Sequence, residues 1–129
     1  GKKAAQTRAT ATYTFDERLD GKSDEIRELT ATIREFILGL DESIEEVPKK
    51  FYVAYKVSQN IACMEVKGKN IKLFLKLKHS DVPDGTPNYR DVTSIGHYGT
   101  GDVEFTVSSE SEFEPVKEFI AMAYNKVGG

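Results

Sequence analysis

The chain has 129 residues, of which 39% are hydrophobic and 30% are charged, and its formal net charge at pH 7 is −3. This length and apolar content are enough for one domain with its own core, and the lone Cys63 excludes an intramolecular disulfide. No apolar run approaches the roughly 20 residues of a membrane-spanning helix and no secretory signal is evident, so a cytoplasmic protein without a membrane partner is predicted.

The first part of the chain predicts a leading segment and a helix. Residues 1–12 are polar or small without apolar periodicity, and they are predicted to be a flexible linker or a cloning remnant before a single domain over 13–129. Ser23 is a good helix cap, and the apolar spacing after it predicts a helix that ends near Gly39. An acidic turn follows, and then three strands separated by hairpin-length turns: 51–57, 61–67 and 71–78.

The second part of the chain begins with a long connection over 78–102. It is rich in glycine and proline, which predicts irregular structure of the kind that often carries function. Alternation predicts a fourth strand over 103–108, and Ser109 with Glu112 forms a capping box for a last helix whose regular part begins at Pro115. The order α-β-β-β-loop-β-α predicts an α+β fold. We expect a four-stranded, mainly antiparallel sheet with the N- and C-terminal helices on one face.

Positive charge is concentrated in the predicted strands. Between Lys49 and His79 there are eight lysines and one acid, Glu65, a local balance of +7, so the rest of the chain carries −10. In the strand 71–78, apolar and basic residues alternate, which predicts a core face and a basic face with interleaved aromatic rings. Such a face suits a phosphate backbone and stacked bases. The candidate nucleic-acid contacts are Lys56, Lys72, Lys76, Lys78, Tyr52 and Phe74. The alternative is a solvated sheet face whose lysines prevent aggregation and whose charge is partly neutralised by Glu104.

The segment Glu65-Val66-Lys67 follows an apolar strand, as in many metal-dependent nucleases. There the acid binds Mg²⁺ and the lysine positions water, but a second carboxylate is also needed. The strand 51–57 contains no acid, and only the acidic turn offers substitutes: Asp41, Glu45 or Glu46. The ligand set is incomplete, so no metal, no cofactor and no catalytic residue is predicted.

The stretch RDVTSIGHYGTGD, residues 90–102, gathers charge and glycine in one loop. It lacks the Lys-Ser/Thr pair of a phosphate loop and precedes a strand, so we expect a rigid turn. An Arg90–Asp91 ion pair and a hydrogen bond from His97 to Asp91 or Asp102 would hold this turn. The alternative is a small-ligand pocket in the 79–102 loop, and the residues that would fix the loop or line the pocket are Arg90, Asp91, His97, Tyr98 and Asp102.

Three segments together resemble an uncharacterised bacterial domain family labelled "predicted transport protein": LDGKSDEIRELTATIREFILGLDESIEEVPKKFYVAYK, IKLFLKLK and RDVTSIGHYGTGDVEFTVSS. The similarity runs from about Tyr13 to Tyr124, and Tyr98 stands where the family commonly has tryptophan. The resemblance implies the C-terminal module of a larger protein, similar to restriction or other DNA-processing systems. It supplies no catalytic residues.

These observations predict a non-catalytic accessory module of a larger bacterial protein. It would bind nucleic acid weakly through the lysine and aromatic sheet face, or dock a neighbouring domain or protein partner. Two alternatives stay open: a metal-dependent nuclease that uses Glu65 and Lys67, and a small-ligand pocket in the 79–102 loop. The oligomeric state is not predicted.

Overall fold

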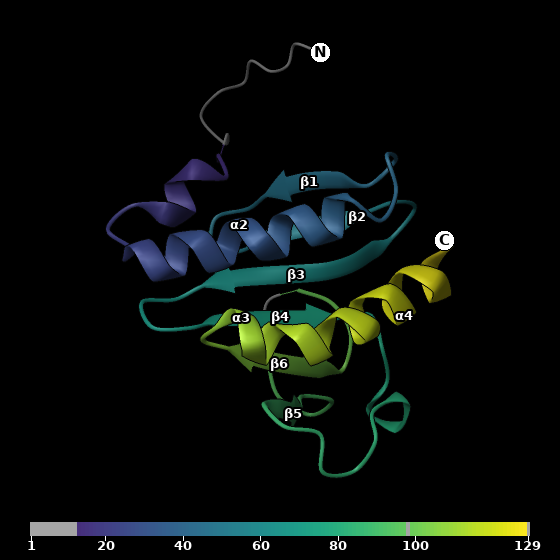
Figure 1. Ribbon diagram of the computed structural model, residues 1–129. Coiled ribbons are helices and arrows are strands. Elements are labelled where there is room, and N and C mark those ends of the chain that lie inside the picture. The colour runs from purple at the N-terminus through teal and green to yellow at the C-terminus, as the bar shows by residue number, and fades with distance from the viewer. Residues whose placement is uncertain (1–12, 98, 129) are drawn as a thin grey trace.

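The computed structural model describes residues 13–97 and 99–128, so the predicted linker at 1–12 and the candidate Tyr98 lie outside the described residues. In this part of the chain, six strands form one antiparallel sheet in the order β1-β2-β3-β4-β6-β5, and helices cover one face of it (Figure 1). The strands are β1 (Glu45–Pro48), β2 (Val53–Lys56), β3 (Asn60–Val66), β4 (Ile71–Leu75), β5 (Tyr89–Asp91) and β6 (Val103–Val107). The helices are α2 (Asp24–Leu38), α3 (Glu110–Phe113) and α4 (Lys117–Val127), with 3-10 turns η2 (Asp16–Leu19), η3 (His79–Asp81) and η4 (Glu114–Val116). The α+β class is confirmed.

The helix boundaries follow the predicted capping signals. The Ser23 hydroxyl accepts a hydrogen bond at 3.2 Å from the first turn of α2, and this helix ends just before Gly39. Ser109 accepts a hydrogen bond at 3.2 Å from the backbone N–H of Glu112. Pro115 lies in η4, between α3 and α4, because a proline has no N–H to donate inside a regular helix. The first helix and the helix cap at Ser109 are therefore confirmed, whereas the regular part of the last helix begins at Lys117 and not at Pro115.

The prediction of four strands is wrong because it misses both edge strands. β1 and β5 are only four and three residues long, too short to show a period of two. β1 also contains two glutamates and Pro48, residue types that are depleted in strands. An edge position tolerates this proline because one side of an edge strand needs no ladder hydrogen bond. The predicted acidic turn therefore includes strand β1, and strand β5 interrupts the predicted long connection.

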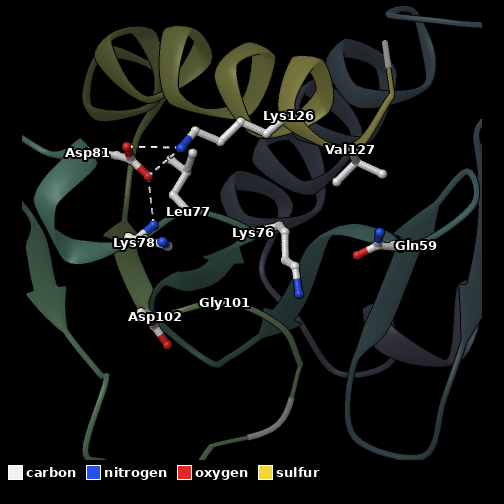
Figure 2. A pocket seen from close by; sticks show the side chains of 9 residues that line it. All are labelled: Gln59, Lys76, Leu77, Lys78, Asp81, Gly101, Asp102, Lys126 and Val127. Atoms are coloured by element: carbon white, nitrogen blue, oxygen red, sulfur yellow. Dashed lines mark hydrogen bonds and ion pairs between the residues drawn. The ribbon is translucent and has the colours of Figure 1, made fainter.

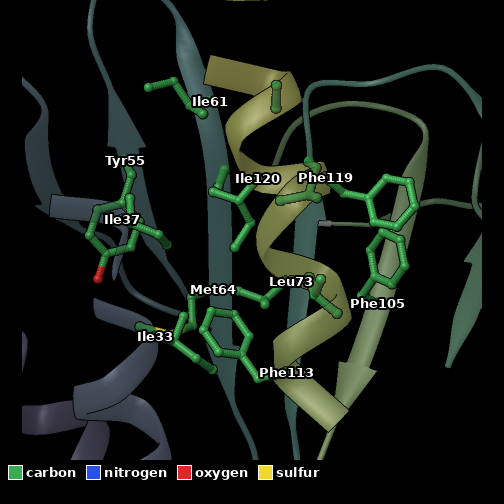
Figure 3. Packing of buried hydrophobic residues seen from close by; sticks show 14 of the residues in the cluster. Ile33, Ile37, Tyr55, Ile61, Met64, Leu73, Phe105, Phe113, Phe119 and Ile120 are labelled. Carbon is green, nitrogen blue, oxygen red and sulfur yellow. The ribbon is translucent and has the colours of Figure 1, made fainter. Parts of the chain in front are cut away.

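The main core lies between the sheet and the helices. Ile33 and Ile37 from α2 and Phe119 and Ile120 from α4 belong to the same buried cluster as the inward-facing residues of the strands (Figure 3). The rings of Phe119 and Phe105 stack with their centroids 5.0 Å apart. Both long helices therefore pack on the same face of the sheet, as the sequence predicts.

The opposite face of the sheet, which we call the outer face, is also partly covered. A second buried cluster joins Ala54, Cys63 and Phe74 of the sheet to Val92 of the loop after β5. The same loop returns close to the sheet at Gly99, where an added Cβ would lie 2.7 Å from the Cβ of Cys63. The middle of the sheet is thus buried on both sides.

Candidate functional site

The predicted lysine and aromatic face is interrupted by the loop that crosses it. Phe74 is only 2% exposed, and its ring stacks on that of His97 with the centroids 4.9 Å apart. A base has no access to this ring in the folded domain, so the prediction of Phe74 as a stacking partner is corrected. The alternation of β4 correctly placed Phe74 on the outer face, but it gave no sign that a distant loop covers that face.

The candidate lysines lie at two opposite ends of the sheet. Lys72 lies near the β3–β4 turn, where it is paired in register with Glu65 on β3. Lys56 ends β2, while Lys76 and Lys78 follow β4, so these three lie toward the β2–β3 turn. We call these regions the β3–β4 end and the β2–β3 end. The structure does not bring the four lysines together on one surface.

Glu104 neutralises part of the outer face near the β3–β4 end. Glu104 is only 4% exposed, and its carboxylate lies 3.0 Å from the Arg90 guanidinium and 3.6 Å from the Lys72 ammonium. The predicted Arg90–Asp91 ion pair is therefore wrong. Asp91 instead accepts hydrogen bonds from the backbone N–H and the hydroxyl of Thr93, at 3.0 and 2.5 Å.

The 90–102 loop is held mainly by its own backbone and by the sheet. His97 does not bond to Asp91 or Asp102 as predicted, because its two ring nitrogens lie 2.8 Å from the Ile95 carbonyl and 3.1 Å from the Gly101 carbonyl. Arg90 and Asp102 line different hollows. The described candidates for a loop pocket do not converge on one space.

A hollow of about 330 Å³ opens at the β2–β3 end, between β4 and the end of α4 (Figure 2). Lys76, Lys78 and Asp102 line it, and Lys126 reaches across from α4 to place its ammonium 3.0 Å from both carboxylate oxygens of Asp81. The backbone N–H of Lys78 and the Lys126 ammonium both lower the pKa of Asp81. The Lys126–Asp81 pair ties α4 to η3, so one of the three ammonium groups here is already neutralised.

A second hollow, also of about 330 Å³, opens at the β3–β4 end. We call it the Phe51 hollow; its lining residues are Glu17, Arg18, Lys22, Lys50, Phe51, Glu65, Val66 and Lys67. They come from η2, the segment before α2, the β1–β2 connection and the end of β3. Four cationic side chains face two carboxylates here, so the local charge is positive although that of the whole chain is negative.

Phe51 is the most exposed large apolar side chain in the described part of the chain, at 54%. The sequence placed it in a strand, but β2 begins only at Val53, because the backbone N–H of Lys49 bonds to the Tyr52 carbonyl at 2.7 Å and forms a tight turn. The Lys50 ammonium lies 5.2 Å from the centre of the Phe51 ring. The turn thus presents an aromatic ring and a cation together at the mouth of the hollow.

Arg18 lines the same hollow with hydrogen-bonding capacity left over. One terminal nitrogen of its guanidinium donates to the Tyr52 carbonyl at 3.3 Å. Its Nε is buried and has no hydrogen-bond partner within residues 13–97 and 99–128. Buried donors without a partner are rare in native proteins, and an ordered water or a bound ion is a common explanation of them.

The carboxylates of the Phe51 hollow bear on the nuclease alternative. Glu65 lies 3.2 Å from the Lys67 ammonium, and the second acid of the hollow is Glu17, not a residue of the acidic turn. Glu46 from that turn instead forms a bidentate ion pair with Arg34. Within the described residues, no group of three or more His, Cys, Asp or Glu side chains is placed to hold a metal ion.

The sequence alone identified only part of the Phe51 hollow. Glu65 and Lys67 were singled out, and Tyr52 and Lys72 lie beside the hollow, but Phe51, Lys50, Lys22 and Arg18 were missed. The run Lys49-Lys50-Phe51-Tyr52 is a local signal for Lys50 and Phe51, since two basic residues stand next to two aromatic ones, a combination that suits nucleic-acid contacts. Arg18 has no comparable signal, because only the fold brings η2 to the end of the sheet.

The comparisons with known proteins place the chain in a family. None of the helices in the described part of the chain has the length and apolar character needed to cross a bilayer. The chain is 33% identical over 111 residues to a protein of Haemophilus influenzae described as "Uncharacterized protein"; the match covers 86% of this chain and 37% of that relative. No solved structure matches. Residues 15–126 match the family described as "Domain of unknown function (DUF5655)", and the chain therefore belongs to this family.

Proposed function

We propose that the domain is a non-catalytic accessory module that binds nucleic acid weakly through the Phe51 hollow. The observation that carries the proposal is the gathering of four cationic side chains around an exposed aromatic ring. Cations attract the phosphate backbone and release its counterions, while an aromatic ring offers a surface on which bases stack. Lys72 and Tyr52, at the same end of the sheet, extend this surface.

The distribution of acidic residues disfavours contact of nucleic acid with the helical face of the sheet. The helical layer is rich in carboxylates, which repel phosphate: Asp24, Glu25, Glu28, Glu35, Glu110, Glu112, Glu114 and Glu118. The net charge of −3 also keeps non-specific attraction low over most of the surface. A localised positive hollow on a negative domain gives a weak interaction with a defined orientation.

An accessory role agrees with the proportions of the relative. The match spans 37% of the Haemophilus influenzae protein, so the domain corresponds to one part of a longer chain there. As a module of a restriction-like or other DNA-processing protein, such a domain would hold nucleic acid near a neighbouring catalytic domain. The label of a transport protein has no counterpart in the surface described above.

The test is a titration of the domain against fluorescent oligonucleotides at several salt concentrations. The double variant Lys22→Gln/Lys50→Gln removes two cations of the Phe51 hollow. It should reduce the slope of log K against log salt by about 1.4 to 1.8, because each lost phosphate contact contributes about 0.7 to 0.9. The matched control is Lys76→Gln/Lys78→Gln at the β2–β3 end, which makes the same change of charge and should alter the slope far less.

Two results would refute the Phe51 hollow as the binding surface. Equal effects of both double variants would mean that only the net charge matters, and a dominant effect of the control would move the contact to the β2–β3 end. If the unmodified domain binds no nucleic acid even at low salt, docking of a neighbouring domain becomes the better explanation of its exposed surface.

A further inference from the structure

We infer that the Phe51 hollow selects single-stranded nucleic acid, with an unpaired base stacked on Phe51 and the adjoining phosphate held by Arg18 and Lys22. The inference rests on the proposed function and specifies its ligand. It is carried by three features of the hollow: the exposed ring, the half-buried guanidinium of Arg18, and the two carboxylates among the lining residues.

The ring of Phe51 can stack on a base only where that base is not already stacked on both sides inside a duplex. In a duplex both faces of each internal base are already stacked on its neighbours, so an aromatic side chain at the surface meets sugar and phosphate. In a single strand the faces of the bases are accessible, and every base can stack on an aromatic ring whatever its sequence. With 54% of its surface exposed at the mouth of a hollow, Phe51 suits the second case.

Arg18 is placed to hold one phosphate next to such a base. Its bond to the Tyr52 carbonyl fixes the guanidinium beside the turn that carries Phe51. The side chain as a whole is only half-buried, so guanidinium N–H groups other than the buried Nε and the one that binds Tyr52 are available to an anion. Arginine binds phosphate with planar, directional hydrogen bonds, whereas Lys22 adds charge without a fixed direction. One phosphate between these two cations lies next to the ring.

The carboxylates of the hollow act against a duplex. Double-stranded DNA carries one negative charge for about every 1.7 Å of its axis, so a duplex laid across the hollow brings phosphates close to Glu17 and Glu65. Lys67 compensates the Glu65 charge at 3.2 Å, so the repulsion of a duplex comes mainly from Glu17. A flexible single strand can direct its phosphates toward Arg18 and Lys22 and away from both acids.

The experiment compares Phe51→Leu with the unmodified domain on a single-stranded DNA oligonucleotide and on the same sequence as a duplex, by fluorescence anisotropy at low salt. Loss of a stacked base should weaken single-strand binding about 5- to 140-fold, from the usual contribution of base–aromatic stacking. Duplex binding should change less than about twofold. Phe51→Tyr keeps a ring at the same place and serves as the matched control, which should bind like the unmodified domain.

The outcomes separate this inference from the proposed function. If Phe51→Leu binds both oligonucleotides as tightly as Phe51→Tyr does, nucleic-acid binding stands but selection by stacking is refuted. The same conclusion follows if the unmodified domain prefers the duplex. If the domain binds neither form at low salt, the proposed function itself fails. Because Phe51 is exposed, circular dichroism of both variants should match that of the unmodified domain.

Discussion

Gly101 is the position at which the 90–102 loop depends most directly on the sheet. Its φ is +78°, and a Cβ added there would overlap the Leu75 carbonyl oxygen and lie 2.5 Å from the Leu75 carbonyl carbon. We predict that Gly101→Ala destabilises the domain by about 2 to 5 kcal/mol. Of this, about 1 to 2 kcal/mol comes from the left-handed backbone and about 1 to 3 kcal/mol from the displacement of packed backbone.

Gly85→Ala is the matched control for Gly101→Ala. Gly85 has nearly the same φ, +81°, but an added Cβ would have no atom within 4 Å. Its substitution should therefore cost only about 1 to 2 kcal/mol, which is the backbone contribution alone. Urea unfolding followed by circular dichroism measures both changes in the free energy of unfolding. Equal destabilisation by the two substitutions would show that the loop does not pack against β4 at Leu75. It would also contradict the burial of the outer face by this loop.

Three further predictions concern the outer face and its edge. Burial raises the pKa of the Cys63 thiol to about 12, so a thiol reagent should react at pH 8 only as fast as the domain opens; rapid labelling of the folded domain would contradict this burial. Hydrogen bonds from the hydroxyl and backbone N–H of Thr93 lower the pKa of Asp91. Because the pKa of Asp91 is lower in the folded state than its unfolded-state value of about 3.9, the ionised carboxylate stabilises the folded domain above that pH. This stability is lost as the pH falls through the pKa of the folded state. Asp91→Asn should therefore destabilise the domain at neutral pH and not at about pH 2, and equal urea midpoints of variant and parent at neutral pH would argue against it. Finally, Arg90→Ala should cost about 1 to 2 kcal/mol in urea unfolding, because it leaves the buried Glu104 with Lys72 as its remaining cation. The loss is smaller than for a fully buried pair since Arg90 is half exposed, and an unchanged midpoint would show that solvent compensates Glu104.

The parts of the fold that were predicted correctly have strong local signals. α2 has a serine cap and a long apolar period, and Ser109 with Glu112 marks the start of the last helical segment. β4 and β6 alternate over five residues each, enough to identify their inward faces. β1 and β5 carry no such pattern, because an edge strand is specified mainly by the partner with which it pairs.

The candidate site was harder to predict because it is assembled from distant segments. Glu65 and Lys67 were found through their order in the sequence. Arg18 joins them only because η2 packs beside the β1–β2 connection, and Phe51 is exposed only because a turn ends before β2 begins. Phe74 shows the opposite error. Its place in the alternating strand predicts an exposed side chain on the outer face, but the loop covers this ring and buries it.

The sequence by itself determined the α+β class, the helix ends, the central strands and the separation of positive from negative charge. These depend on capping groups and on periods of two and 3.6 residues, which act between neighbours in the chain. Only the tertiary structure decided that the 90–102 loop covers the outer face, that the lysines are divided between two ends of the sheet, and that Arg18 and Phe51 share a hollow. An alternating strand shows that a sheet has two faces, but what packs on each face depends on contacts between residues far apart in sequence, which no local pattern encodes.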